Sequence, residues 1–135
     1  MLTGGCYCGA VRYAADGPGF SQTICHCVDC RRVSGAPCVA WFTMTNREYR
    51  ITQGTAGRFQ SSPGVTRTFC AACGTPLTYQ HDDRPGEIDV TTASLDDPEA
   101  APPLDHTYAA SRPSWMVIGD SLPRYLRTRS EGQKE

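Results

Sequence analysis

The chain has 135 residues, including 13 glycines, 10 prolines and eight cysteines, which predicts a single domain with one modest core. Its net charge of −1 gives no overall basic field, so we expect neither nucleic acid nor an anionic membrane surface as a partner. The first residues lack a basic region followed by an apolar run, and about 18 consecutive apolar residues occur nowhere. These absences predict a cytoplasmic protein without a signal peptide or a spanning helix.

Short β-strands are predicted along most of the chain, because short runs of β-forming residues alternate with glycine and proline. Residues 11–14 alternate with a period of two, and residues 38–44 (CVAWFTM) are rich in β-formers. The expected strands are 11–14, 21–25, 38–44, 49–52, 58–60, 66–69, 76–80, 88–92 and, at a sheet edge, 106–109. The predicted fold class is therefore mainly β: a single domain of short, irregular antiparallel sheets, similar to a β-sandwich.

Little helix is expected. Residues 28–34 are long enough only for a helical turn that ends at Gly35, and residues 45–48 predict another turn. Residues 93–103 are expected to form a long loop. The domain is predicted to span residues 1–123, and the charged residues 124–135 to form a frayed tail.

The cysteines carry the strongest functional signal. In a reducing compartment, cysteines at such spacings are metal ligands or thiolates more often than disulfides. They form an N-terminal pair (Cys6, Cys8), a central triad (Cys25, Cys27, Cys30), a second pair (Cys70, Cys73) and the single Cys38. Zinc needs four ligands in a tetrahedron, and a C-x-C or C-x-x-C turn brings two sulfurs close together.

The spacing permits two ways to divide these groups. In one, the two pairs close a four-thiolate structural zinc site, and the triad holds a second zinc with an open position, as catalytic zinc requires. In the other, Cys27 and Cys30 join the second pair in a zinc ribbon, and the remaining cysteines stay free. The first division is favoured because the second leaves four cysteines unused. Cys38 lies in a strand-like run and is expected to pack in the core.

Charged and polar neighbours of the triad are candidates for substrate contact. Arg31 and Arg32 follow Cys30 directly and could pair with substrate carboxylates. The same sequence is equally compatible with two solvated arginines on a short turn. His26 lies between two predicted ligands, and its side chain is expected to point away from the zinc. His81 and His106 are isolated and are interpreted as structural.

Longer segments around the cysteines resemble the glutathione-dependent formaldehyde-activating family, which includes centromere protein V. The resemblance rests on three motifs in the family's order: GGCYCGAVRY at 4–13, CHCVDCRRVSGA at 25–36, and SSPG at 61–64 leading to FCAACGTPL at 69–77. It continues through residues 88–90, 94–98, His106 and SRPSW at 111–115, and covers roughly residues 3–123.

This resemblance implies a β-rich fold around two zincs. The structural ion would be held by the two pairs, and the ion assigned to catalysis by the triad. The implied activity is the condensation of glutathione with formaldehyde to S-hydroxymethylglutathione, formally a carbon–sulfur lyase reaction in reverse. The expected partners are therefore a small thiol and a small aldehyde. Two alternatives stay open: a non-catalytic zinc module that binds or carries glutathione, and an interaction module, which the lack of a basic stripe disfavours.

Overall fold

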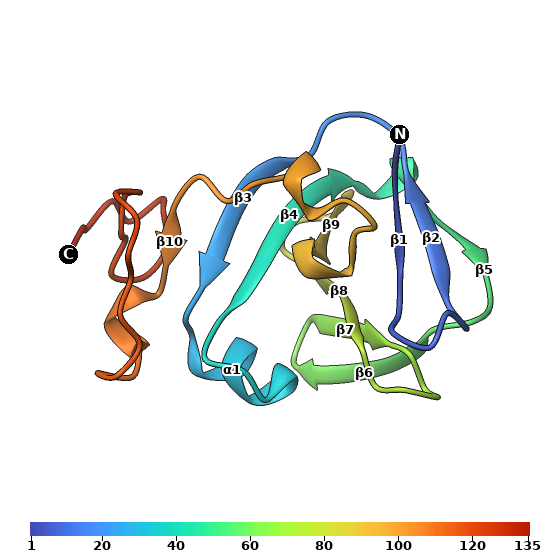
Figure 1. The fold of residues 1–135 in the computed structure, drawn as a ribbon, viewed down its shortest axis with the longest axis horizontal. Coiled ribbons are helices and arrows are strands. Elements are labelled where there is room, and N and C mark those ends of the chain that lie inside the picture. The colour runs from blue at the N-terminus through green and yellow to red at the C-terminus, as the bar shows by residue number, and fades with distance from the viewer.

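Two β-sheets form the framework of the computed structural model, which describes residues 1–135 (Figure 1). The smaller sheet has the strand order β1-β2-β5, with bounds Leu2–Gly5, Arg12–Ala15 and Tyr49–Gln53. The larger sheet has the order β10-β3-β4-β9-β8-β7-β6, with bounds His106–Thr107, Phe20–Cys25, Val39–Thr45, Glu87–Thr91, Pro76–His81, Val65–Phe69 and Gly57–Ser62. All neighbours are antiparallel except β10, which is parallel to β3. The mainly-β prediction is confirmed.

Helices are few and short. The one α-helix, α1 (Val28–Ser34), connects β3 to β4 and ends at Gly35, whose φ of 64° lies in the left-handed region that favours glycine (Figure 1). The single-turn 3₁₀ helices are Asn46–Glu48, Thr92–Ser94, Pro98–Ala100 and Ala109–Ser111. Two of them interrupt the predicted 93–103 loop. None of the helices has the length and apolar character needed to cross a membrane.

The main core lies between the two sheets, and strand β4 shows how this arrangement creates a second face. Phe42 and Met44 are fully buried in the main core together with Tyr13 of the smaller sheet. Trp41 and Thr43 alternate with them, and both line a cavity on the other face of the larger sheet. The larger sheet therefore packs one face on the core and leaves the other for a site.

Strand β1 could not be predicted, because Gly4 and Gly5 are poor β-formers. The strand forms because it pairs along its whole length with β2. At Gly4 a side chain would collide with the Tyr13 ring and with the carbonyl oxygen of Ser94. The close packing of β1 against the core therefore requires glycine at position 4, although glycine has a low intrinsic propensity for β-strands.

Residues 124–135 are not frayed, contrary to expectation. They lie beside β10 at the edge of the larger sheet (Figure 1). The Tyr108 amide donates to the carbonyl of Arg127 at 2.9 Å. Arg129 pairs with the buried carboxylate of Asp105, from Nη2 to Oδ1 at 3.0 Å. A buried carboxylate is stable only beside a cationic partner, so the ion pair between Arg129 and Asp105 holds residues 124–135 against the fold.

Candidate functional site

The two cysteine pairs meet at one point, although they are far apart in the sequence. Cys6 and Cys8 lie in the β1–β2 turn, Cys70 and Cys73 in the β7–β8 turn, and their four sulfurs are all within 4.8 Å of one another. The Sγ–Sγ distance is 3.6 Å between Cys6 and Cys8 and 3.7 Å between Cys8 and Cys70. A tetrahedral zinc–thiolate site places its sulfurs about 3.8 Å apart. This four-cysteine cluster therefore fits a metal ion and has no position left for another ligand.

Both turns of the four-cysteine cluster have the same backbone construction. The Gly9 amide donates to the carbonyl of Cys6 at 3.2 Å, and the Gly74 amide donates to the carbonyl of Cys70 at 2.7 Å. The glycine φ angles are 81° and 85°, in the region that other residues rarely adopt. The glycine after each cysteine motif thus permits the tight turn, as the sequence predicts.

The central triad forms a separate group of three sulfurs, all within 4.8 Å of one another. Cys25 ends β3, Cys27 caps the N-terminus of α1, and Cys30 lies in its first turn. The Cys30 amide donates to the Cys27 sulfur at 3.3 Å. No fourth cysteine, histidine or carboxylate joins this group. The triad could therefore hold a metal ion while leaving one tetrahedral position to a ligand from outside the chain.

The three thiols of the triad do not ionise independently. Hydrogen bonds donated by the thiols of Cys25 and Cys30 lower the pKa of Cys27 to about 2. The proton that Cys25 shares with Cys27 raises the pKa of Cys25, and burial raises it further. Without a cation, one thiolate forms at the expense of its neighbours. Three thiolates can coexist only beside a positive ion, which matches the chemistry of a zinc ligand set.

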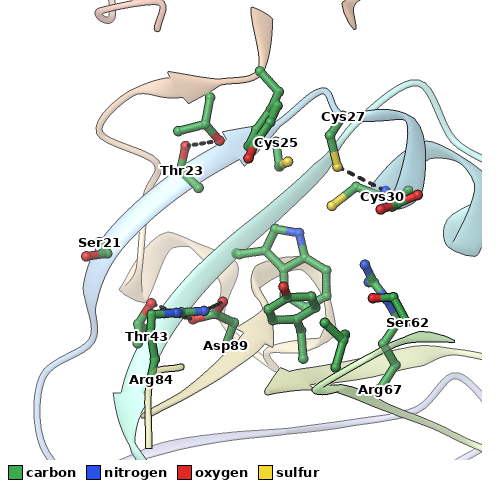
Figure 2. Close-up of a pocket in the computed structure, with 16 residues that line it drawn as sticks. Ser21, Thr23, Cys25, Cys27, Cys30, Thr43, Ser62, Arg67, Arg84 and Asp89 are labelled. Atoms are coloured by element: carbon green, nitrogen blue, oxygen red, sulfur yellow. Dashed lines mark hydrogen bonds and ion pairs between the residues drawn. The ribbon is translucent and has the colours of Figure 1, made fainter. Parts of the chain in front are cut away.

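A cavity of about 300 Å³ opens at the triad, on the face of the larger sheet that is turned away from the main core (Figure 2). All three cysteines line it, whereas no member of the four-cysteine cluster does. Trp41, Tyr79 and Tyr108 form its aromatic lining and pack against the triad. The triad thus faces a space large enough for a small ligand.

Two arginines line the cavity, and the protein pairs only one of them with carboxylates. Arg84 Nη2 donates to Asp89 Oδ2 at 2.7 Å, and Nη1 donates to Glu87 Oε2 at 3.0 Å. Arg67 has no carboxylate partner and donates from Nε to the Ser61 hydroxyl at 3.1 Å.

The arginines that the sequence suggested for substrate contact lie elsewhere. Arg31 Nη1 donates to the carbonyl of Ser111 at 3.5 Å, and neither Arg31 nor Arg32 lines the cavity. Cys38 belongs to neither cysteine cluster and is half-buried outside the main core, so its expected place in the core is wrong. His81 is half-buried at the end of β8, and its Nδ1 accepts from the amide of Asp83 at 3.0 Å.

His26 and His106 form a buried hydrogen-bonded chain that ends at Asp120. His26 Nε2 lies 2.9 Å from His106 Nδ1, and His106 Nε2 lies 3.0 Å from Asp120 Oδ2. A carboxylate only accepts, so His106 donates from Nε2 to Asp120. When the His106 ring is neutral, its Nδ1 accepts from Nε2 of His26. Burial, and then His106, lowers the pKa of His26 to about 4, so the ring is neutral at neutral pH. His26 is not part of the triad's group of ligand atoms, and its bond to His106 ties the backbone beside the triad to the C-terminal segment.

Replacing His106 with alanine is expected to lower the free energy of unfolding by about 2–4 kcal/mol, because it leaves a cavity and deprives the fully buried His26 of its partner. Urea unfolding followed by circular dichroism measures the effect. His81→Ala is the matched control, expected to change stability by less than about 0.5 kcal/mol. Equal stability of the two variants would show that the chain of hydrogen bonds contributes nothing.

Arg67, Tyr79 and Tyr108 are among the cavity residues that sequence reasoning did not single out. A signal existed for Arg67, which shares the inward face of β7 with the buried Val65. An arginine at an inward position of an alternating strand is uncommon and indicates a function. No comparable signal marks Tyr108, which reaches the cavity from the far end of the sequence through β10.

Comparisons with known proteins agree with this geometry. A family model described as "Glutathione-dependent formaldehyde-activating enzyme" matches residues 1–111. A crystal structure of a Rhodobacter sphaeroides protein is similar, with a TM-score of 0.60 and 28% sequence identity over 70% of this chain and 87% of that chain. No curated protein matches. The family match covers both cysteine clusters and every strand of both sheets, and the chain therefore belongs to the glutathione-dependent formaldehyde-activating enzyme family.

Proposed function

We propose that the protein is a zinc-dependent carbon–sulfur lyase-type enzyme that acts on adducts of a thiol, such as glutathione, with formaldehyde or another small carbonyl. One observation carries the proposal: of the two cysteine clusters, the one with only three ligands lines a cavity. The closed cluster lies between two hairpin turns, where a substrate could gain no coordination position. The division into a structural and a catalytic zinc follows from this difference.

The triad would hold the catalytic zinc, and the cavity would hold the substrates. Zinc bound there supplies a coordination position that favours the thiolate form of a thiol. The aromatic lining of Trp41, Tyr79 and Tyr108 excludes water and holds the carbonyl close to the sulfur. Formaldehyde is small and uncharged, so it needs no ionic partner in the protein.

Tyr108 is suited to supply the proton that the addition requires. Burial, and then the charges of Cys25 and Cys27, raises the pKa of Tyr108, so its hydroxyl keeps its proton at neutral pH. In the step that we propose, the thiolate sulfur attacks the carbonyl carbon, and a carbon–sulfur bond forms. The π electrons of the carbonyl move onto oxygen, which takes the Tyr108 proton, and Tyr108 then regains the proton that the thiol released. No oxidant or reductant is consumed.

The activity can be tested with the zinc-loaded protein, glutathione and formaldehyde. Exchange NMR measures how fast formaldehyde and its glutathione adduct interconvert, with and without protein. Acceleration above the spontaneous rate supports catalysis. Binding of glutathione by calorimetry without acceleration would instead identify a module that carries the thiol, and absence of both would refute the proposal.

Tyr108→Phe is expected to lower kcat about 100-fold or more, because general acid catalysis contributes about 10²–10⁴-fold to a rate. The KM for the thiol should change little, since the ring remains in place. Tyr125→Phe removes a hydroxyl outside the cavity and serves as the control. If both variants keep the wild-type rate, the proton comes from another group.

A further inference from the structure

Arg67 is a cation that is nearly buried and lacks a counter-ion in the protein. Its exposed fraction is 9%, and no other arginine of the chain is buried. It makes no salt bridge, and its single side-chain hydrogen bond uses Nε. A guanidinium carries five N–H donors, so the four on the two terminal nitrogens have no protein partner. The two terminal nitrogens nevertheless stay accessible, so this poorly hydrated cation is expected to meet an anion from outside the chain.

The sheet holds the Arg67 side chain in one orientation. Tyr79 is its direct cross-strand neighbour in β8, and the guanidinium lies 4.8 Å from the centre of the Tyr79 ring. Tyr79 in turn packs edge-on against Trp41, with ring centroids 6.2 Å apart. Stacking and the Nε bond to Ser61 leave the two terminal nitrogens for a ligand. A guanidinium held in this way is prepared for two parallel hydrogen bonds to a carboxylate.

The other charges of the cavity do not neutralise Arg67. Asp89 pairs with Arg84 and accepts from the Thr43 hydroxyl at 2.7 Å. Asp29 lines the cavity but makes no ion pair with Arg67. Figure 2 shows Arg67 rising from its strand beside Ser62, while the triad approaches from the opposite side of the cavity. The cavity therefore presents a group of thiols and a free guanidinium to the same small ligand.

We propose that Arg67 binds a carboxylate of the thiol substrate, so that the site selects thiols that carry a carboxylate over neutral thiols of the same size. The inference rests on the proposed function, because it names the class of thiol that the triad accepts. Glutathione has two carboxylates and belongs to this class. Formaldehyde has no carboxylate, so of the two substrates only the thiol can pair with the guanidinium.

The test compares 3-mercaptopropionate with its amide, 3-mercaptopropionamide, which has nearly the same size and lacks the charge. Calorimetry on the zinc-loaded wild type is expected to show the acid binding about 10- to 100-fold more tightly. Arg67→Gln should bind both thiols with the affinity of the amide. Arg67→Lys keeps the charge without the fork and should retain part of the preference. Arg58→Gln, on the neighbouring strand β6 and outside the cavity, should behave as the wild type.

Each outcome has a separate meaning. Equal binding of acid and amide to the wild type would overturn the role of Arg67 without touching the proposed function, and this comparison needs no variant to fold. If Arg67→Gln weakens both thiols equally and lowers the zinc content, Arg67 balances the charge of the triad instead of binding substrate. If neither thiol binds the zinc-loaded wild type, the assignment of Arg67 is wrong, and the proposed function is tested separately by the exchange assay with glutathione.

Discussion

Cys70→Ala is expected to yield a chain that does not fold cooperatively. Cys70 is 1% exposed, lies in the main core and supplies one sulfur of the four-cysteine cluster. Structural zinc contributes about 10–16 kcal/mol in small zinc domains. Whole domains are stable by only about 5–15 kcal/mol, so loss of this ion removes more than the remaining contacts supply. Thermal unfolding followed by circular dichroism, together with zinc analysis of the soluble fraction, measures the effect.

Cys38→Ala provides the matched control for Cys70→Ala. It makes the same chemical change at the one cysteine outside both clusters. We expect a cooperative transition near that of the wild type and two zincs per chain. A folded Cys70→Ala protein with two zincs would contradict the structural role of the four-cysteine cluster.

Cys27→Ala is expected to remove one zinc and abolish activity while the fold persists. Cys27 is half-buried and belongs to the small cavity-side cluster rather than the main core. Its loss removes the N-cap of α1, which costs about 0.5–2 kcal/mol, well below the stability of the domain. Thiol–aldehyde exchange should fall by more than about 100-fold, since even the outer partners of metal ligands affect activity by about 10–100-fold. Zinc analysis, exchange NMR and thermal unfolding on one preparation test all three statements.

Cys27→Ser separates the two roles of Cys27. Serine is a good N-cap but a poor zinc ligand, so this variant should recover stability without recovering zinc or activity. If Cys27→Ser regains activity, the cysteine acts through the helix. If Cys27→Ala and Cys70→Ala unfold alike, the division into catalytic and structural clusters is wrong.

The cysteine groupings were predictable because they depend on local geometry. A C-x-x-C or C-x-C turn forms within a few residues, and the trailing Gly9 and Gly74 indicate the backbone that it needs. With two cysteine pairs and one triad, only a few combinations provide the four ligands of a zinc ion. Most strands of the larger sheet were predictable for the same reason, since each is a short run between turn residues.

The substrate side of the site was harder to predict because it depends on strand register. Arg67 meets Tyr79 only because β7 and β8 pair in one particular register. Arg31 and Arg32 are close to the triad in sequence, yet α1 directs them away from the cavity. Asp120 reaches His106 through residues 105–135, which long-range hydrogen bonds hold in place. None of these contacts leaves a periodic or spaced pattern in the sequence.

The separation of the two cysteine pairs has a consequence for biosynthesis. Cys8 and Cys70 are 62 residues apart in the sequence, and closing so long a loop is a slow, non-local event. During translation the N-terminal pair emerges first and has to wait for its partner turn, while the strands between them already present unpaired edges. We therefore expect a shortage of metal ion as the second pair emerges to delay closure of this loop and to favour aggregation.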